Sequence, residues 1–133
     1  MRFRFSPAAG GAFKGDGLRP VFAYRDLGMG EATDGRYHAH VIRAADRPRG
    51  TGPDEGAWHV HDLESQMVYV LKGTVTFEYE GQGRIAMTAG DAVHQPPGIR
   101  HRLITHSPDM ELLEITSPAE FATRDVAAPV SQE

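Results

Sequence analysis

The amino-acid sequence predicts a single all-β domain. The chain has 133 residues, a length typical of one domain that buries a core of its own. Its 15 glycines and 9 prolines fall mostly between short apolar runs, as expected for brief strands joined by turns rather than for long helices. Residues 75–79 alternate apolar and polar side chains, which places Val75, Phe77 and Tyr79 on one face of a strand.

The chain divides into an arm, a body and a tail. Residues 1–20 are rich in glycine and other small residues, and we expect an arm that pairs with a neighbouring strand edge or with a second subunit. The body is expected over residues 21–118, because a Ser-Pro pair ends its last apolar run. Residues 119–133 are small and polar, and we expect a tail that is loose or briefly helical around residues 119–126.

Short apolar runs within the body predict its strands, and residues with turn chemistry separate them. A loop rich in glycine, proline and charge is expected over residues 45–56, and Lys72 and Gly73 join two runs into a hairpin. The predicted strands are, in order, residues 37–44, 58–61, 66–71, 75–79, 85–87, 92–95, 101–105 and 111–116.

Composition excludes several classes of protein. The chain has no cysteine, so it has no disulfide, thiolate metal site or thiol nucleophile. Its formal charge is −4 and its basic residues are scattered, which argues against a nucleic-acid partner. No run approaches the roughly 18 apolar residues of a membrane span, and the N-terminal residues lack the apolar core of a signal peptide. We therefore expect a soluble cytoplasmic protein without a membrane partner.

Histidines in the middle of the chain predict a metal site. His59 and His61 are two residues apart, so on a strand both side chains leave the same face. Gln66 opens the next strand on the face of Val68 and Val70, and His101 opens a later one. Three strands would thus place polar ligands at one end of an apolar interior. Such a donor set suits one divalent transition metal, which could be Fe, Zn, Ni, Mn, Co or Cu.

The same residues resemble the first motif of the cupin superfamily. That motif has two histidines one residue apart, here His59 and His61, then a carboxylate four or five positions on and a closing glycine, here Gly73. The position of the carboxylate, counted back from Gly73, is occupied by Gln66.

The second cupin motif is also similar to a segment of this chain. Gly90 is followed after five residues by Pro96-Pro97-Gly98 and after two more by His101. The resemblance implies a small single-domain cupin, or monocupin, whose double-stranded β-helix (the cupin jelly-roll barrel) spans residues 21–118. It also implies one metal ion held by His59, His61, Gln66 and His101, because these positions match the ligands of the family.

Glutamine in the carboxylate position has a chemical consequence. A glutamate would neutralise one of the two charges of the metal, whereas Gln66 leaves both, so we expect a preference for anionic ligands such as a carboxylate or an enolate. Redox oxygen chemistry is less favoured for the same reason. A role for Gln66 as a pocket-lining amide stays open, and Glu64, two positions too early for the motif, is expected in a turn.

Other polar residues have two possible roles. His38 and His40 repeat the alternating pattern without a third ligand, so we expect a partly exposed strand face. His94 and Glu114 are the candidates for a catalytic acid or base. The orientation of His94 is open, and Glu114, between Leu113 and Ile115, is expected to point outward unless it serves the barrel interior. Arg100 and Arg102 are expected on the face opposite His101, as solvated charges.

Trp58, Met67 and Tyr69 have the parity opposite to the ligand positions. They are expected on an outer apolar face, through which two copies form a homodimer.

The expected function is that of a metal-dependent enzyme acting on a small, anionic molecule. The metal would serve as Lewis acid or oxygen-activating centre, in a reaction of the dioxygenase, decarboxylase or isomerase type. The alternative is a non-catalytic module that binds or senses a small molecule. A structural cupin with a vestigial site is disfavoured, because His59, His61 and His101 are all present.

Overall fold

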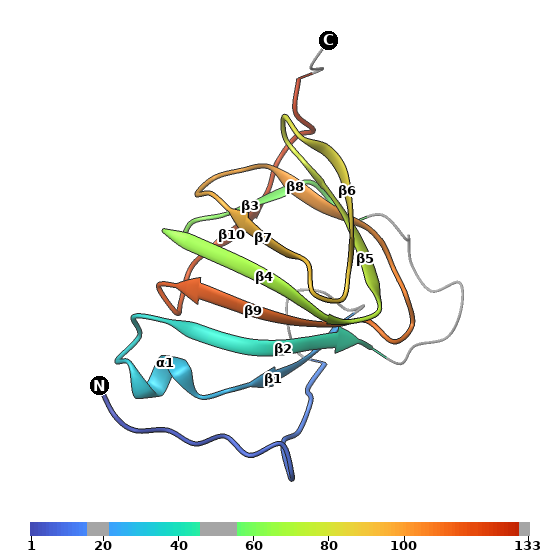
Figure 1. Ribbon diagram of the computed structural model, residues 1–133. Helices are drawn as coiled ribbons and strands as arrows, with labels where there is room; N and C mark the ends of the chain where they lie inside the picture. The colour runs from blue at the N-terminus through green and yellow to red at the C-terminus, as the bar shows by residue number, and fades with distance from the viewer. Residues whose placement is uncertain (16–21, 46–55, 131–133) are drawn as a thin grey trace.

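The computed structural model describes residues 1–15, 22–45 and 56–130, and it confirms the all-β fold. Two five-stranded sheets face each other in a jelly-roll barrel, and neighbouring strands within these residues are antiparallel (Figure 1). The first sheet has the order β1 (Phe22–Asp26), β2 (His38–Ala44), β9 (Glu111–Ser117), β4 (Ser65–Lys72) and β7 (Ala92–Gln95). The second has the order β10 (Thr123–Asp125), β3 (His59–His61), β8 (His101–His106), β5 (Thr74–Tyr79) and β6 (Gly83–Thr88).

Each strand predicted between residues 37 and 116 is present, with ends that differ by at most a few residues. The structure adds β1 and the one-turn helix α1 (Met29–Ala32), which the sequence did not predict. The expectation of a loose or helical tail is wrong at residues 123–125, because they form β10, which pairs with β3. Backbone hydrogen bonds to β3 define this strand, and its polar side chains carry no apolar alternation to predict it.

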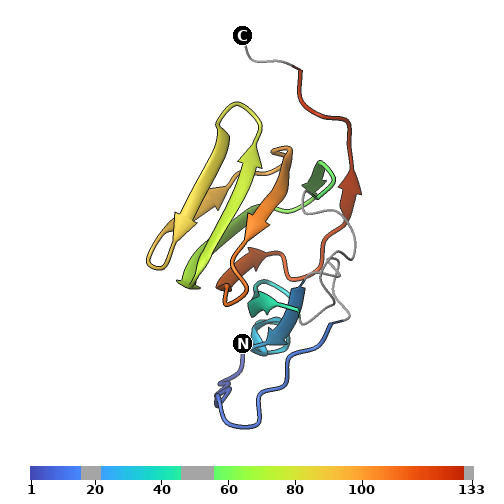
Figure 2. The same ribbon diagram turned by 90° about the vertical axis from the view of Figure 1, so that its right-hand side faces the viewer.

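The arm contacts the edge of the first sheet. Lys14 pairs antiparallel with Tyr24 of β1, as expected for a segment that finds order at a strand edge. Figure 2 shows this segment, in dark blue, passing β1 at the end of the molecule away from β6. The predicted loop over residues 45–56 falls mostly on residues 46–55, which lie outside the described residues. The boundaries at residues 20 and 118 stay predictions.

The apolar core fills one end of the barrel, near the turn between β4 and β5. Val70, Val75, Met110 and Leu112 are at most 1% exposed there, because the inward faces of both sheets alternate apolar residues. Gly73 makes the turn with a φ of 72°, and a side chain at this position would collide with Ser107 and with the backbone of Met110. Polar residues occupy the opposite end of the barrel, where β4 and β8 begin.

An apolar face lies on the outside of the first sheet. Tyr69, Leu71 and Ile115 are 39%, 43% and 36% exposed, and Met67 is half-buried beside them. Trp58 instead comes directly before β3 of the second sheet, and the guanidinium of Arg102 is 5.0 Å from its ring centroid. No helix in the described part of the chain is long and apolar enough to cross a membrane.

Candidate metal centre

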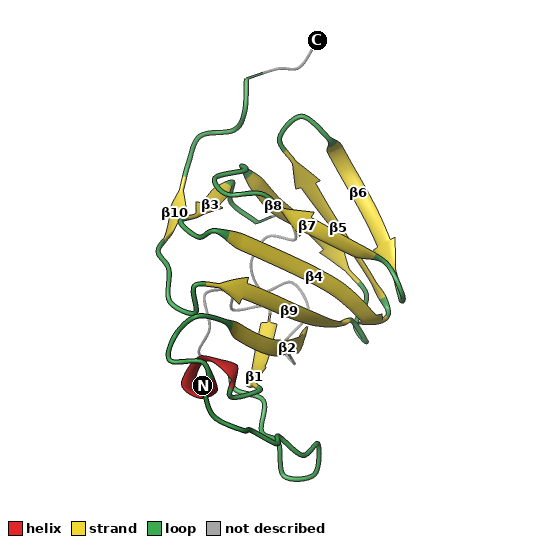
Figure 3. Cartoon of the chain, turned by 60° about the vertical axis from the view of Figure 1, so that its left-hand side comes forward, coloured by secondary structure: helices red, strands yellow, loops and turns green. Residues whose placement is uncertain are grey.

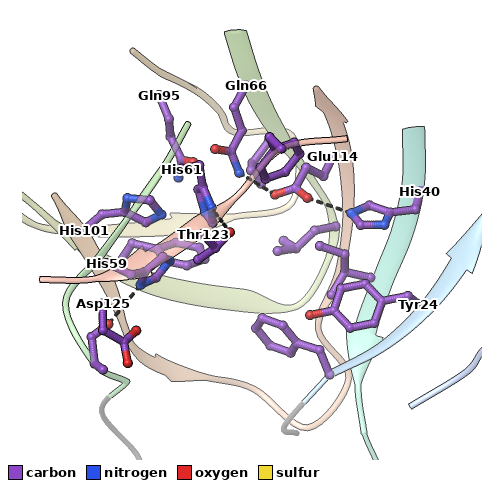
Figure 4. Close-up of a pocket in the computed structure, with 17 residues that line it drawn as sticks. Tyr24, His40, His59, His61, Gln66, Gln95, His101, Glu114, Thr123 and Asp125 are labelled. Carbon is purple, nitrogen blue, oxygen red and sulfur yellow. Dashed lines mark hydrogen bonds and ion pairs between the residues drawn. The ribbon is translucent and has the colours of Figure 1, made fainter. Parts of the chain in front are cut away.

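Three histidines meet at the polar end of the barrel. His59 and His61 lie on β3, and His59 is opposite His101 of β8 in the strand register. One ring nitrogen from each lies within 4.8 Å of the others (Figure 4). His59 and His101 are only 4% and 3% exposed, so their rings face the barrel interior. The alternation along β3 and the register of β3 with β8 bring the three histidines together, and they could hold a metal ion.

Hydrogen bonds at the far side of each ring orient the cluster for ligation. Nδ1 of His59 is 2.9 Å from the carbonyl oxygen of Ala57, and Nδ1 of His101 is 3.0 Å from that of Ile99. A carbonyl only accepts, so Nδ1 carries the proton, and Nε2 of the neutral ring carries the lone pair that a metal needs. Nδ1 of His61 is 2.7 Å from Oγ1 of Thr123 on β10. These contacts are the outer-shell partners that metal-binding histidines typically have, so the donor set fits a transition metal.

The Thr123 contact gives the unpredicted strand β10 a specific role. Replacing Thr123 by valine keeps the shape of the side chain but removes the hydroxyl that contacts Nδ1 of His61, and we expect a metal affinity about 10–100-fold lower. The affinity would be measured by competition with a chromophoric chelator.

Thr105→Val is the matched control, because Thr105 is exposed on β8 and does not line the cavity. Equal affinities for the two variants would show that β10 does not support the centre.

Gln66 lies beside the histidines, but its amide nitrogen contacts a carboxylate. The side chain is 4% exposed, and Nε2 donates to Oε2 of Glu114 over 2.8 Å. Figure 4 shows the amide oxygen turned away from Glu114. Glu64, by contrast, is exposed and does not line the cavity, as expected. Gln66 as a fourth ligand stays a prediction.

A second buried amide is next to Gln66. Gln95 of β7 is opposite Gln66 in the register, and its Nε2 donates to the hydroxyl of Tyr79 over 2.6 Å. Burial raises the pKa of Tyr79 to about 12, so the phenol is neutral, and its ring stacks on His101 at 5.8 Å between centroids. These contacts fix the wall of the cavity behind His101.

The expectation that Glu114 points outward is wrong. Its side chain is 16% exposed and lines the cavity, and Oε1 is 2.6 Å from Nε2 of His40. Burial by itself raises the pKa of Glu114, but the hydrogen bond and charge of His40, with the Gln66 amide, hold that pKa below its ordinary value. The carboxylate is therefore ionised. The amide of Gln66 lies between this negative charge and the histidine cluster. A metal ion bound by the histidines would therefore have a negative charge nearby, although Gln66 itself is neutral.

The expectation of a partly exposed strand face fits His38, which is 22% exposed and does not line this cavity, but it is wrong for His40. His40 is 15% exposed and lines the cavity, where its ring is 5.2 Å from that of Tyr24. The signal that could have shown this is Ile42, an apolar residue two positions on that is 4% exposed on the same face. Tyr24 belongs to β1, a strand that the sequence did not predict.

The remaining candidates lie outside the cavity. His94 is exposed and contacts the hydroxyl of Ser65 at 3.3 Å, so it is not placed to act as an acid or base in the cavity. Arg100 and Arg102 do not line it either, as expected. Arg102 is paired rather than solvated, because it donates to Glu78 over 2.9 Å.

The cavity joins these groups in one space of about 680 Å³. The histidine cluster lies on one side, the pair of Glu114 and His40 on the other, and Gln66 between them (Figure 4). The apolar lining consists mainly of Phe22, Ile42, Val68, Phe77, Leu112 and Phe121. This combination of apolar walls and a few converging polar groups is typical of a site for a small molecule.

Comparisons with known proteins identify the family. The family model of the cupin domain matches residues 49–116, about half of the chain, and no curated protein matches the sequence. The polyketide cyclase RemF from Streptomyces resistomycificus is 19% identical with a TM-score of 0.72, over 99% of this chain and 89% of that one. An RmlC-like cupin from Shewanella frigidimarina is 23% identical with a TM-score of 0.64, over 86% and 90%. A variant of Streptomyces PAC13 with uridine is 15% identical with a TM-score of 0.66, over 98% and 95%. The fold is shared with all three, and the match to the family model shows that this chain belongs to the cupin family.

Proposed function

We propose that the protein is a metal-dependent enzyme that moves a proton on a small molecule. The observation that carries this proposal is the carboxylate of Glu114, which faces the cluster of His59, His61 and His101 across one cavity. When bound, a divalent metal supplies Lewis acidity and an open position for a substrate oxygen. We also propose Gln66 as a fourth ligand through its amide oxygen, because its nitrogen is held by Glu114.

The residues of the chain divide the remaining work. Glu114 is placed to take a proton from a substrate carbon or hydroxyl and to return it elsewhere. His40 stabilises the carboxylate, and Gln66 fixes its second oxygen. The apolar walls, which include Val68 and Leu112, exclude water from the cavity and strengthen these interactions.

This arrangement favours a small substrate with a carboxylate or an enolisable carbonyl. Such a group offers oxygen to a dication and an acidic proton to Glu114. The reaction is then of the isomerase, lyase or decarboxylase type rather than a dioxygenation. The comparisons support a protein that acts on or binds a small molecule, since RemF is named a polyketide cyclase and the PAC13 structure contains uridine.

A panel of small oxo acids and diketones in D₂O tests the proposal. With the metal bound, one class of compound should lose a carbon-bound proton signal in ¹H NMR as deuterium is incorporated. A compound that binds, seen by its line broadening, without exchange or turnover would favour the alternative, a binding or sensing module. The metal should be identified first by elemental mass spectrometry of untagged protein. Zinc or nickel would support Lewis-acid chemistry, whereas iron would favour oxygen chemistry.

The cytoplasmic location and the homodimer stay predictions. The exposed outer face with Tyr69, Leu71 and Ile115 is the surface proposed to meet a second copy.

A further inference from the structure

Two buried side-chain atoms in the described part of the chain have no hydrogen-bond partner, and both belong to neighbours of Gln66. They are Oε1 of Gln95 and Oγ1 of Thr116, whose side chains are 2% and 1% exposed. Gln95 on β7 and Thr116 on β9 are the register partners of Gln66 on the two sides of β4 (Figure 3). The large majority of buried polar atoms are paired in folded proteins, so an unpaired one in a cavity wall points to a partner that the chain itself does not supply.

Gln95 is the one of these two residues that can meet a molecule in the cavity. Its side chain lines the cavity, whereas Thr116 does not. Figure 4 shows Gln95 beside Gln66, on the side of the cavity that holds His101. Because Gln95 is buried in the cavity wall, a partner for its Oε1 comes from the cavity rather than from bulk solvent.

Tyr79 fixes the orientation of the Gln95 amide. Nε2 of Gln95 donates to the hydroxyl of Tyr79 over 2.6 Å. The Tyr79 side chain is 4% exposed, and its ring centroid is 6.0 Å from that of Phe77 and 5.8 Å from that of His101. The phenol is therefore held firmly, so Nε2 of Gln95 stays on the Tyr79 side and Oε1 stays on the other side of the amide.

The chemistry of Oε1 selects the group that it can bind. An amide oxygen accepts hydrogen bonds and donates none, so it recognises an O–H or N–H group and does not recognise a carboxylate or a carbonyl. An aliphatic amine is protonated at neutral pH, and a dication at the histidine cluster would repel its positive charge. A hydroxyl group is neutral and donates, so it is the group that suits this part of the wall.

We propose that Gln95 determines specificity, because its Oε1 accepts a hydrogen bond from a hydroxyl group of the substrate. This inference rests on the proposed function for the place of the substrate, whose carboxylate or carbonyl oxygen lies at the histidine cluster. Gln95 is linked to that cluster through Tyr79, which stacks on His101, so the hydroxyl lies close to the metal-binding group. The substrate class thereby narrows from acids and ketones in general to hydroxy acids and hydroxy ketones.

Mandelate and 2-phenylpropanoate are matched probes for this test, because they differ only in a hydroxyl group that a methyl group replaces. Calorimetric titration of the metal-loaded full chain should give a dissociation constant about tenfold or more lower for mandelate, since 2-phenylpropanoate leaves Oε1 of Gln95 without a partner. In Gln95→Met, which keeps the length of the side chain without the acceptor, the two constants should be nearly equal. Thr116→Val is the matched control, because it removes the other unpaired atom outside the cavity, and it should keep the preference for mandelate.

The same variant separates the effect of Gln95 from that of the metal. A hydroxy acid can also chelate a metal through its hydroxyl, and a preference with that cause would persist in Gln95→Met and overturn the proposal. Equal constants in the wild type, or no binding of mandelate, would overturn it as well. A second measurement needs no variant: the side-chain carbonyl carbon of Gln95, followed by ¹³C NMR in zinc-loaded protein, should shift with mandelate and not with 2-phenylpropanoate.

These measurements involve no turnover, so their failure is distinct from failure of the proposed function. If deuterium incorporation is absent for every compound while the preference for mandelate holds, Gln95 recognises a hydroxyl group in a cavity that binds without converting. If deuterium is incorporated but the two probes bind equally, the enzyme class stands and Gln95 has no part in recognition.

Discussion

His101→Ala is expected to abolish stoichiometric metal binding. The substitution removes one of three imidazoles whose ligand atoms converge within 4.8 Å, and the ring is buried, so no other side chain takes its place. The loss should exceed the roughly 10–100-fold that follows removal of an outer-shell partner. Elemental mass spectrometry should find close to one transition metal per chain in the wild type and almost none in the variant.

The control for this prediction is His94→Ala, which removes an exposed histidine outside the cavity. Its metal content should equal that of the wild type. A metal retained in full by His101→Ala would contradict the centre at the polar end of the barrel. Gln66→Leu then tests the fourth ligand, since full retention there would remove Gln66 as an essential ligand and leave the three histidines.

The histidine cluster could be predicted from the sequence because most of its geometry depends on the spacing of residues within a strand. A spacing of two residues places His59 and His61 on the same face of one strand, whatever the rest of the chain does. His101 could be predicted as a third ligand only because the second cupin motif matches as well as the first. The register of β3 with β8 places His101 opposite His59. Parity and motif spacing thus predicted three side chains from two strands.

The opposite wall of the cavity could not be predicted in the same way. The contact between His40 and Glu114 joins residues 74 positions apart in sequence, and it depends on the pairing of β2 with β9. On β9, Leu112 faces the core while Ile115 is on the outer face, so apolar residues occur on both faces. Alternation alone therefore left the inward face undecided, and Glu114 was assigned to the wrong one.

The support of the centre by β10 was also beyond sequence reasoning. Thr123 is a small polar residue in a polar tail, and nothing in its neighbours indicates a strand. Its hydroxyl reaches His61 only because the backbone of β10 pairs with β3. Outer-shell contacts of this kind arise from tertiary pairing, so they are visible only in the folded chain.

Glu114→Gln is expected to remove turnover while the metal stays bound. The amide has the size of the carboxylate but takes up no proton at neutral pH, so deuterium incorporation should fall by about 10²–10⁴-fold. Metal content should stay near the wild-type value, because Glu114 is not one of the three clustered histidines. Rates of exchange by ¹H NMR and elemental analysis of the same samples measure both quantities.

Glu111→Gln is the matched control, since Glu111 is on the same strand but does not line the cavity. It should leave both quantities unchanged.

The two ways in which Glu114→Gln could depart from expectation have different meanings. Unchanged exchange would show that Glu114 moves no proton, and the binding or sensing module would become the better function for this cavity. Loss of the metal would show that the ion needs the negative charge of Glu114. That carboxylate contacts the amide of Gln66, the residue at the position where the cupin motif has a carboxylate ligand. Retained metal with lost exchange is the one combination that requires an acid–base role for Glu114.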